Sequence, residues 1–361
     1  MIYSMSNIYT LMFYLFIYLI SSLFFKISEK FEEKYIWLLT LLAPTILAAF
    51  RWNVGTDFST YLHLLNTLKN ISFAEWIKDF NFFGDVPIGL FLVIKIANLF
   101  SADKVVFFGI FAILSLAPIL LFLKNQKKEF DASLALFIYL LTLFSSGLNI
   151  MKQGVAAAFI IFSLQYVFEK NIIKFSISIF FACLFHPTAI ISFIIYFIIN
   201  KNKCVDNWRK IIFSLISILL PICMDVILPL FGERYGNYAD MSIENGGSNK
   251  SFFLKLIWLL IYLIFRKKLI EKNKMNELLI MMFLIGTVFE SLGFVSIYGK
   301  RIAMYFSCSN FLLMSQLPFV FREEDKKIVK FIIALYSVLL FTYTYVVLEQ
   351  SGICPYNYIV E

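Results

Sequence analysis

The sequence is a succession of long apolar runs separated by short polar segments. One of them, VVFFGIFAILSLAPILLFL (residues 105–123), contains no charged residue. A helix that crosses the hydrocarbon of a bilayer needs about 20 apolar residues. Within lipid, only helices and closed barrels satisfy every backbone hydrogen bond. Runs this long and uniformly apolar therefore predict transmembrane helices.

The composition rules out a soluble globule. The 361 residues are 60% hydrophobic and 16% charged, against about 45–50% and 25% in soluble domains. We predict an all-α polytopic integral membrane protein with one transmembrane domain over residues 1–361 and about 12 transmembrane helices. The predicted spans are 8–25, 35–50, 105–123, 133–150, 153–168, 172–186, 188–199, 211–231, 252–265, 278–297, 302–321 and 331–348.

Basic residues predict the orientation of these spans, because cytoplasmic loops are enriched in lysine and arginine. Lysine and arginine collect in six short loops. These loops share one side only if segment 86–100, with Lys95 at its centre, forms a re-entrant or half-buried helix. Both termini, segment 51–85 with its short helices and loop 232–251 then lie outside. The polar motifs described below fall near the outer face, which predicts an outward-facing cavity.

Charge and cysteine content narrow the class of function. The net charge of +8 follows the positive-inside bias, so we expect no nucleic-acid partner. Five scattered cysteines and two histidines, without a CxxC pair, predict no metal site. The sequence has no glycine loop of the Walker type. We therefore expect a protein that uses no metal, nucleotide or other cofactor.

The first polar motif is RWNVGTDF, residues 51–58. Gly55 is expected to adopt positive φ in a tight turn. Asp57 is either the N-cap of the next helix or a carboxylate in an outer vestibule beside Arg51. Arg51 is either an interfacial anchor or a buried cation. In the second case we expect it beside an acid or a bound phosphate.

The second motif is LNIMKQGVAAAF, residues 148–159. The spacing of Asn149, Lys152 and Gln153 predicts one shared helical face. Gly154 and the alanines 156–158 favour close helix packing. Lys152 and Gln153 are candidates for binding an anionic head group.

The third motif is FHPTAI, residues 185–190. Pro187 suits the first position of a helix, so His186 is expected at a helix junction. His186 is there either a structural hydrogen-bonding residue or a general base. Two acids within apolar runs, Asp225 and Glu290, are candidate counter-ions.

The fourth motif is SIYGKRIAMYF, residues 296–306. Tyr298, Arg301 and Tyr305 are predicted to share a helical face, with Lys300 adjacent. Guanidinium and ammonium groups bind phosphate, and aromatic rings can stack on sugars.

The order of RWNVGTDFSTY, MKQGVAAAF, FHPTAI and GKRIAMYF resembles the EpsG-like branch of the Wzy-type polysaccharide polymerases. Lys152 stands where that family usually has arginine. The resemblance implies a multi-pass enzyme of the bacterial inner membrane. Such an enzyme is a glycosyltransferase that joins oligosaccharide repeat units carried on polyprenyl (undecaprenyl) diphosphate at the outer face. The product would be O-antigen (lipopolysaccharide), capsule or exopolysaccharide, and a chain-length regulator is an expected partner beside the membrane lipids.

The chemistry of such a reaction assigns expected roles. Arg51, Arg301 and Lys152 would stabilise the leaving diphosphate. His186 is the natural general base. Asp57 is the alternative base, or the residue that orients His186.

Three other functions remain open. A flippase or transporter for lipid-linked oligosaccharide would also need a cationic cavity, although carriers usually bind substrate at the membrane midplane. A glycosyltransferase that uses polyprenyl-phosphate sugars usually places an acidic pair in its first external loop, where Asp57 stands alone. A membrane O-acyltransferase rests on a single histidine.

Overall fold

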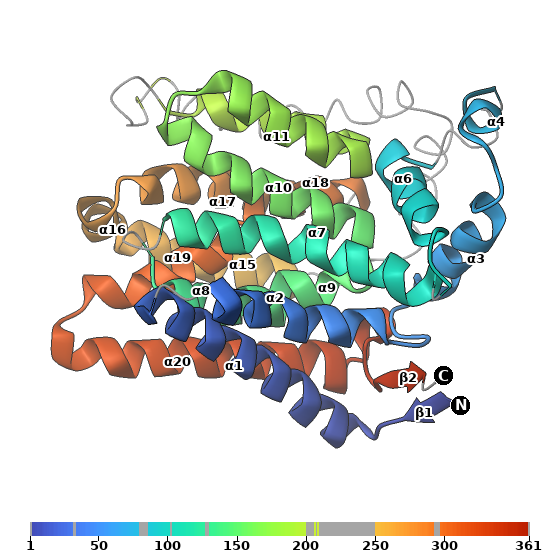
Figure 1. Ribbon diagram of the computed structural model, residues 1–361. Helices are drawn as coiled ribbons and strands as arrows, with labels where there is room; N and C mark the ends of the chain where they lie inside the picture. Colours follow the sequence, from blue (N-terminus) through green and yellow to red (C-terminus); the bar gives the residue numbers. More distant parts are fainter. Residues whose placement is uncertain are drawn as a thin grey trace. The chain divides into compact units, whose positions relative to one another are not determined.

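The computed structural model describes residues 2–31, 34–78, 86–101, 103–126, 130–199, 206, 208, 250–291 and 297–359. The described chain is almost entirely helical (Figure 1). It divides into two compact units. The first unit is Met1–Phe162, Phe180–Pro187 and Ile328–Glu361, and the second is Ser163–Ile179 and Thr188–Lys327.

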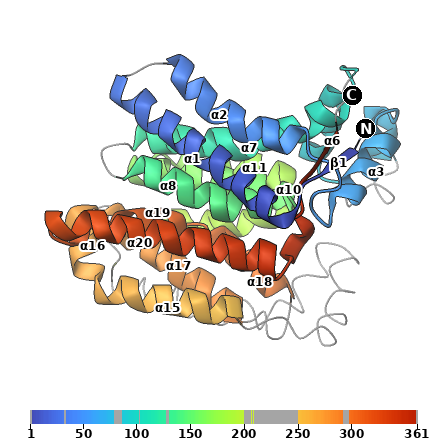
Figure 2. The same cartoon turned by 90° about the horizontal axis from the view of Figure 1, so that it is seen from below.

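Four helices form the centre of the first unit. Helix α2 packs against α1 and α7, and α8 packs against the same two helices (Figure 2). Interhelical hydrogen bonds accompany this packing: Ser21 Oγ donates to Thr40 O (2.8 Å), and Tyr139 Oη donates to Ser115 O (2.7 Å). Such bonds are favoured within lipid because water is absent there. The helices are α1 (Asn7–Phe31), α2 (Lys34–Ala49), α7 (Asp103–Asn125) and α8 (Ala132–Tyr139), the last continued by the π-helix η1 (Leu140–Phe144) and α9 (Ser145–Gly147).

Three short helices lie between α2 and α7 in the sequence. They are α3 (Phe58–Leu68), α4 (Phe73–Lys78) and α6 (Ile88–Ala97). Helix α6 is about 15 Å long at 1.5 Å per residue, half of the roughly 30 Å of hydrocarbon. Lys95 Nζ donates to Leu68 O (3.0 Å) and Lys69 O (2.9 Å), which caps the C-terminal end of α3. The short helix predicted within 86–100 is present, and its re-entry into the membrane stays a prediction.

The two ends of the chain meet in the first unit. Strands β1 (Ile2–Ser4) and β2 (Asn357–Ile359) pair antiparallel, so the labels N and C lie side by side in Figure 1. The remaining elements of this unit are parts of α10 (Met151–Phe168), α11 (Ile172–Phe185) and α20 (Glu323–Phe341), then η6 (Thr342–Val347) and η7 (Gln350–Gly352).

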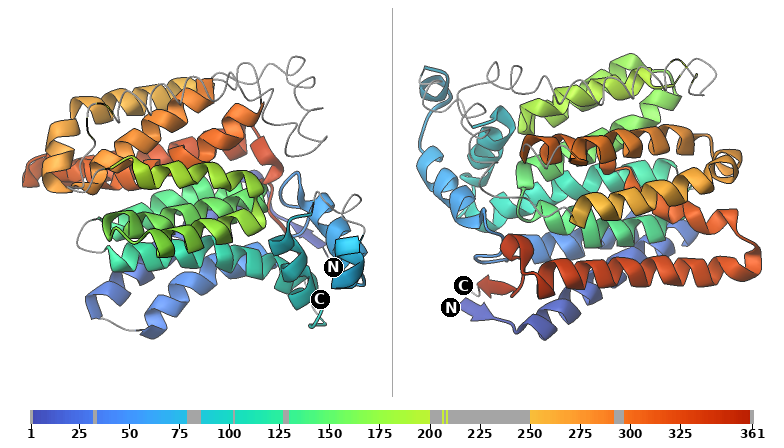
Figure 3. Two further views of the ribbon diagram at one scale, coloured as in Figure 1. Left: turned by 90° about the horizontal axis from the view of Figure 1, so that it is seen from above. Right: turned by 180° about the vertical axis from the view of Figure 1, so that it is seen from behind.

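In the second unit α17 packs against α15 and α18, which appear as the orange helices in Figure 3. A Cβ atom at Gly286 would lie 2.6 Å from Ser307 N, so glycine is what lets α18 approach. Lys255 Nζ pairs with Glu290 Oε2 at 2.7 Å, which makes Lys255 the partner of that buried acid. The elements are η2 (Pro187–Phe197), α15 (Lys250–Ile264), α16 (Arg266–Lys272), α17 (Met275–Ser291), α18 (Ile297–Ser307), α19 (Asn310–Gln316) and η5 (Leu317–Val320).

Helices occur in eleven of the predicted spans, whereas 211–231 and Asp225 lie outside the described residues, as do positions 232–249 of the predicted external loop. Four helical segments are long and apolar enough to cross a membrane: Asn7–Phe31, Asp103–Asn125, Met151–Phe168 and Glu323–Val347. The other apolar helices are shorter. The structure is therefore that of an all-α membrane protein, while twelve spans and an outward-facing cavity stay predictions.

Candidate functional site

Arg51 lies at the C-terminal ends of two helices, and only 3% of its surface is exposed. Its Nη1 donates to Ala48 O (3.3 Å) in the last turn of α2. Its Nη2 donates to Leu148 O (2.9 Å), directly after α9, and to Met151 Sδ (3.0 Å). The guanidinium also lies 4.5 Å from the ring centre of Phe108 on α7. Arg51 thus connects α2, α7 and the junction of α9 with α10 in the first unit.

The buried charge of Arg51 is compensated by peptide carbonyls. Among the described residues no carboxylate pairs with it. The last carbonyls of a helix together carry roughly half a negative charge, and Arg51 contacts two such ends. Burial lowers the pKa of Arg51 to about 10, so the side chain stays charged at neutral pH. Of the two expected partners of a buried Arg51, an acid and a bound phosphate, no acid contacts it among the described residues: helix ends and an aromatic face lie there instead.

The space beside Arg51 is very small. A cavity of about 10 Å³ lies against its side chain, lined also by Ser115, Gly147 and Met151. A single water molecule needs about 10–15 Å³. Nε of Arg51 is buried and has no hydrogen-bond partner among the described residues. This cavity has room for at most one water and none for a phosphate.

Gly55 and Asn149 join the first motif to the second. Gly55 has φ +100°, as predicted, and a Cβ there would lie 3.2 Å from Leu148 O. Asn149 Oδ1 accepts hydrogen bonds from Thr56 Oγ1 (3.1 Å) and from the backbone N–H of Asp57 (2.8 Å). One side chain thus holds the turn that presents Asp57. The hydrogen bonds link segments more than 90 residues apart in sequence.

Asn149 does not share a helix with Lys152 and Gln153, which corrects the predicted common face. Helix α10 begins at Met151, and residues 148–150 form the turn that precedes it. Met151 N donates to Asn149 O, so the chain turns tightly here. Within α10, Lys152 is half-buried and Gln153 is buried, 5% exposed.

Gly154 allows the close approach that its motif predicts. A Cβ at Gly154 would lie 3.1 Å from the Cα of Gly147, the last residue of α9.

Asp57 occupies the N-cap position of α3, but its carboxylate makes no capping hydrogen bond. Asp57 is half-buried, and its role as a vestibule carboxylate stays a prediction.

The C-terminal segment 351–358 also contacts the RWNVGTD turn, which the sequence did not predict. Gly55 N donates to Gly352 O (2.8 Å), and Thr56 N donates to Ser351 O (2.9 Å). Tyr356 Oη donates to Leu47 O (2.7 Å) at the end of α2. A backbone bridge joins Arg51 to Tyr358, and Trp52 N donates to Asn357 O (2.8 Å). The segment therefore holds the RWNVGTD turn by hydrogen bonds separate from those of Asn149.

Three motifs contribute to one apolar cluster in the first unit. The ring of Phe185, directly before His186, lies 5.9 Å from that of Phe111. Phe58 stacks on Phe108 at 4.8 Å. His186 is half-buried, and it lies at the junction of α11 and η2, as predicted, with Pro187 the first residue of η2. Members of the cluster from the motifs are Phe58, Met151, Val155 and Phe185.

In the second unit the third and fourth motifs meet. Thr188 Oγ1 and Tyr305 Oη share a hydrogen bond of 3.0 Å. Tyr305 is fully buried, so its hydroxyl anchors the start of η2 to α18. Lys300 and Arg301 are half-buried on the same helix. Tyr298 lies in the first turn of α18, three residues before Arg301 as predicted.

Within the described residues, His, Cys, Asp and Glu side chains form no group of three suited to a metal ion. Arg51, Asp57, Lys152, Gln153 and His186 belong to the first unit, and the four candidates on α18 belong to the second.

Comparison with known proteins identifies the family. A search of curated proteins and a search of solved structures find no match to this chain. The sequence model of the EpsG family, a family of Wzy-like polymerases, matches residues 34–358. The matched range contains all four motifs and the C-terminal segment that holds the first of them. The chain belongs to the EpsG family.

Proposed function

We propose that this membrane protein joins oligosaccharide repeat units carried on polyprenyl diphosphate, at the outer face of the bacterial inner membrane. The observation that carries the proposal is the joining of motifs that are distant in sequence. Asn149 ties the RWNVGTD turn to the start of α10, and Tyr305 ties α18 to Thr188. The first tie lies within the first unit and the second within the second unit. In a chain of a polymerase family, such ties favour polar groups that distant motifs present together within each unit.

The reaction forms one C–O bond, breaks another and transfers one proton. A hydroxyl oxygen of the acceptor sugar attacks the anomeric carbon of the donor, and a new C–O bond forms. The bond from that carbon to the diphosphate breaks, and its electron pair leaves with the lipid diphosphate. The hydroxyl proton passes to a general base. The donor sugar is already activated, because its leaving group is a lipid diphosphate, so the protein needs no nucleotide. The task of the protein is to position the substrates and to stabilise the charge that develops.

We assign these tasks by chemistry and exposure. His186 is the general base, because its half-buried ring lies at a helix junction and imidazole titrates near neutral pH. Asp57 orients His186 or replaces it as base. Arg301, Lys300 and Lys152 are half-buried cations for the diphosphate.

Arg51 takes a different role in the proposal, that of a positioning residue, since its guanidinium is fully enclosed. Tyr305 likewise positions Thr188. Gln153 and Tyr298 are the candidates for contact with the sugar. A chain-length regulator remains an expected partner.

Replacement of Arg301 tests the function. In a host that depends on this chain for its surface polysaccharide, Arg301→Ala and His186→Ala should leave single lipid-linked repeats and no polymer. Arg301→Lys should restore little, because a point charge lacks the planar fork of guanidinium. Arg322→Ala is the matched control, since this exposed arginine lies outside the four motifs.

The outcomes separate the candidate functions. Unchanged polymer in both alanine variants, at equal protein level, would remove these residues from the site. A carrier would instead leave the repeats on the cytoplasmic leaflet, which a membrane-impermeant glycosidase applied from outside detects. Accumulation of inaccessible repeats in cells that lack the chain would favour the carrier.

The outer position of the site is tested by labelling. In a variant without native cysteines, Asn70→Cys after α3 and Lys30→Cys in the last turn of α1 are exposed positions. An impermeant thiol reagent should label position 70 but not position 30 in intact cells. The reverse pattern would put the motifs on the cytoplasmic side.

A further inference from the structure

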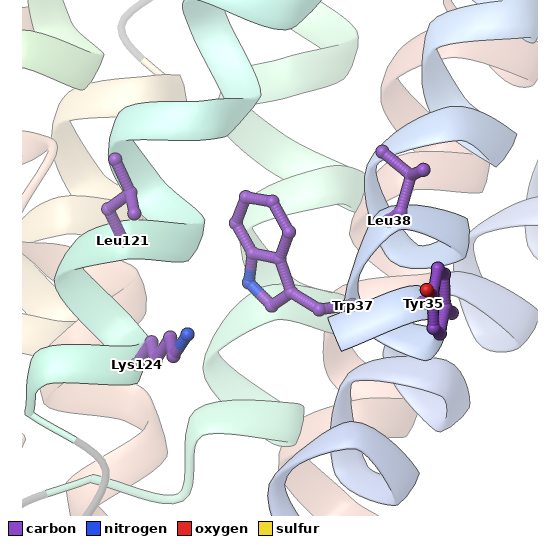
Figure 4. Close-up of a pocket in the computed structure, with 5 residues that line it drawn as sticks. All are labelled: Tyr35, Trp37, Leu38, Leu121 and Lys124. Carbon is purple, nitrogen blue, oxygen red and sulfur yellow. The ribbon is translucent and has the colours of Figure 1, made fainter. Parts of the chain in front are cut away.

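A pocket lies in the first unit, between the beginning of α2 and the end of α7, away from Arg51. It has a volume of about 440 Å³, within the roughly 300–1,000 Å³ of small-molecule sites. Figure 4 shows three side chains that α2 contributes and two from the last turns of α7. The five residues are Tyr35, Trp37, Leu38, Leu121 and Lys124.

Two nitrogen donors face this pocket. Trp37 Nε1 is buried and has no hydrogen-bond partner among the described residues. In Figure 4 the nitrogen edge of the indole is turned toward α7 and the Lys124 ammonium. Lys124 Nζ lies 5.9 Å from the centre of the Trp37 ring. A buried N–H without an acceptor is unfavourable, so Trp37 Nε1 is suited to donate to an oxygen atom of a ligand, and the nearby cation favours a negatively charged one.

The walls of the pocket are apolar. Leu38 and Leu121 are 45% and 40% exposed, and Tyr35 is 81% exposed. In a membrane protein such exposed leucines contact acyl chains, while tryptophan, tyrosine and lysine lie at the level of the head groups. Among the described residues, the pocket lining therefore combines an acyl-chain surface with one cation and one N–H donor that has no hydrogen-bond partner.

We propose that this pocket binds an anionic glycerophospholipid of the bilayer. The phosphodiester accepts the Trp37 N–H and pairs with Lys124, and the acyl chains lie along Leu38 and Leu121. One cation matches the single net charge of this lipid class. A zwitterionic lipid carries its own cation and gains less from Lys124. Basic pockets at helix ends are known to take anionic head groups.

Fluorescence quenching tests the proposal on the purified full-length protein. The protein is placed in mixed micelles with phosphatidylglycerol or phosphatidylcholine whose acyl chains are brominated. The difference between wild type and Trp37→Phe gives the share of quenching at Trp37. We expect phosphatidylglycerol to quench this share at about fivefold lower mole fraction, the factor that one basic residue supplies at an anionic surface.

Lys104 provides the matched control at the other end of α7, where its Nζ lies 5.4 Å from the ring of Trp52. Lys124→Gln should abolish the preference for phosphatidylglycerol, and Lys104→Gln should keep it. Equal quenching by the two lipids, or a preference that survives Lys124→Gln, would overturn the proposal.

A second measurement applies if Trp37→Phe does not fold. Native mass spectrometry of wild type and Lys124→Gln, released from the same phosphatidylglycerol micelles, counts the retained lipids. We expect one phosphatidylglycerol fewer on the variant. Equal retention would contradict the site. Neither experiment requires polymerase activity, so the lipid site and the proposed function can fail independently.

Discussion

A cation lies beside an aromatic ring near each end of α7, but the surroundings of the two cations differ. At one end Arg51 lies over Phe108, and its guanidinium is enclosed by the carbonyls of Ala48 and Leu148. At the other end Lys124 lies near Trp37, beside a pocket of about 440 Å³. Both pairs are cations next to aromatic rings. Such a pair is structural where backbone carbonyls already accept the hydrogen bonds of the cation. It can bind a ligand where they do not.

The largest effect is expected at the enclosed end. Arg51→Ala removes two hydrogen bonds from a charged donor to carbonyl oxygens, each worth about 1.5–3 kcal/mol, besides the weaker one to Met151 Sδ, so the free energy of unfolding should fall by about 3–6 kcal/mol. Arg51→Lys keeps the charge but cannot reach both carbonyls, and should lose about half as much. Unfolding in mixed micelles, titrated with dodecyl sulfate, measures these differences, with the exposed Arg322→Ala as control.

The same variants separate positioning from substrate contact. If Arg51→Ala unfolds like wild type but makes no polymer, Arg51 touches the substrate in a conformation other than this one. Wild-type stability in Arg51→Lys would show that the planar fork is unnecessary.

A smaller effect is expected at Asn149. Asn149→Ala leaves the Asp57 N–H without its acceptor and should cost about 1–3 kcal/mol. Thr56→Val removes only the hydroxyl bond to the same Oδ1 atom, so its cost should be about 0.5–1.5 kcal/mol. Both are read from the same titration. If the Thr56 variant lost as much as the Asn149 variant, the hydrogen bond to the Asp57 N–H would not be what holds this turn.

Tyr356 should contribute less still. Tyr356→Phe removes one neutral hydrogen bond, to Leu47 O, worth about 1 kcal/mol. Tyr9→Phe is the matched control, because Tyr9 is 68% exposed on α1. Equal stability of the two variants would mean that the C-terminal segment is held by its backbone pairing alone.

The smallest change is expected for the two lysines of α7. Lys104→Ala and Lys124→Ala each remove one cation from an aromatic ring, which at exposed sites is worth about 0.5–1 kcal/mol. The free energy of unfolding should fall by no more than this in either variant. If the free energy of unfolding fell by several kcal/mol in Lys124→Ala alone, Lys124 would have a structural role like that of Arg51, and the contrast between the two would not hold.

Helices and local turns were predictable from the sequence. The run 105–123 becomes Asp103–Asn125, and 172–186 becomes Ile172–Phe185. The positive φ of Gly55 and the start of η2 at Pro187 were also predicted correctly. Each of these features depends on properties of neighbouring residues, namely apolar length, the missing Cβ of glycine and the fixed φ of proline.

The contacts that build the candidate site were not predictable in the same way. Gly55 N to Gly352 O is a backbone hydrogen bond, and every residue except proline offers the same donor and acceptor. Asn149 was expected on a helix, although it lies in the turn before α10. A buried Arg51 was expected beside an acid or a bound phosphate, because a sequence does not show where helix ends converge. Its neighbours in space come from four separate segments.

The pairing of residues 351–358 with the RWNVGTD turn has a consequence for biosynthesis. About 300 residues separate Gly55 from Gly352, and at roughly 5–20 residues per second the ribosome needs about 15–60 s to make them. Throughout that interval the newly inserted turn has no partner for the N–H groups of Gly55 and Thr56. The turn therefore cannot make these two hydrogen bonds before residues 351 and 352 have been synthesised, and a nascent chain halted before residue 351 would carry all four motifs without them.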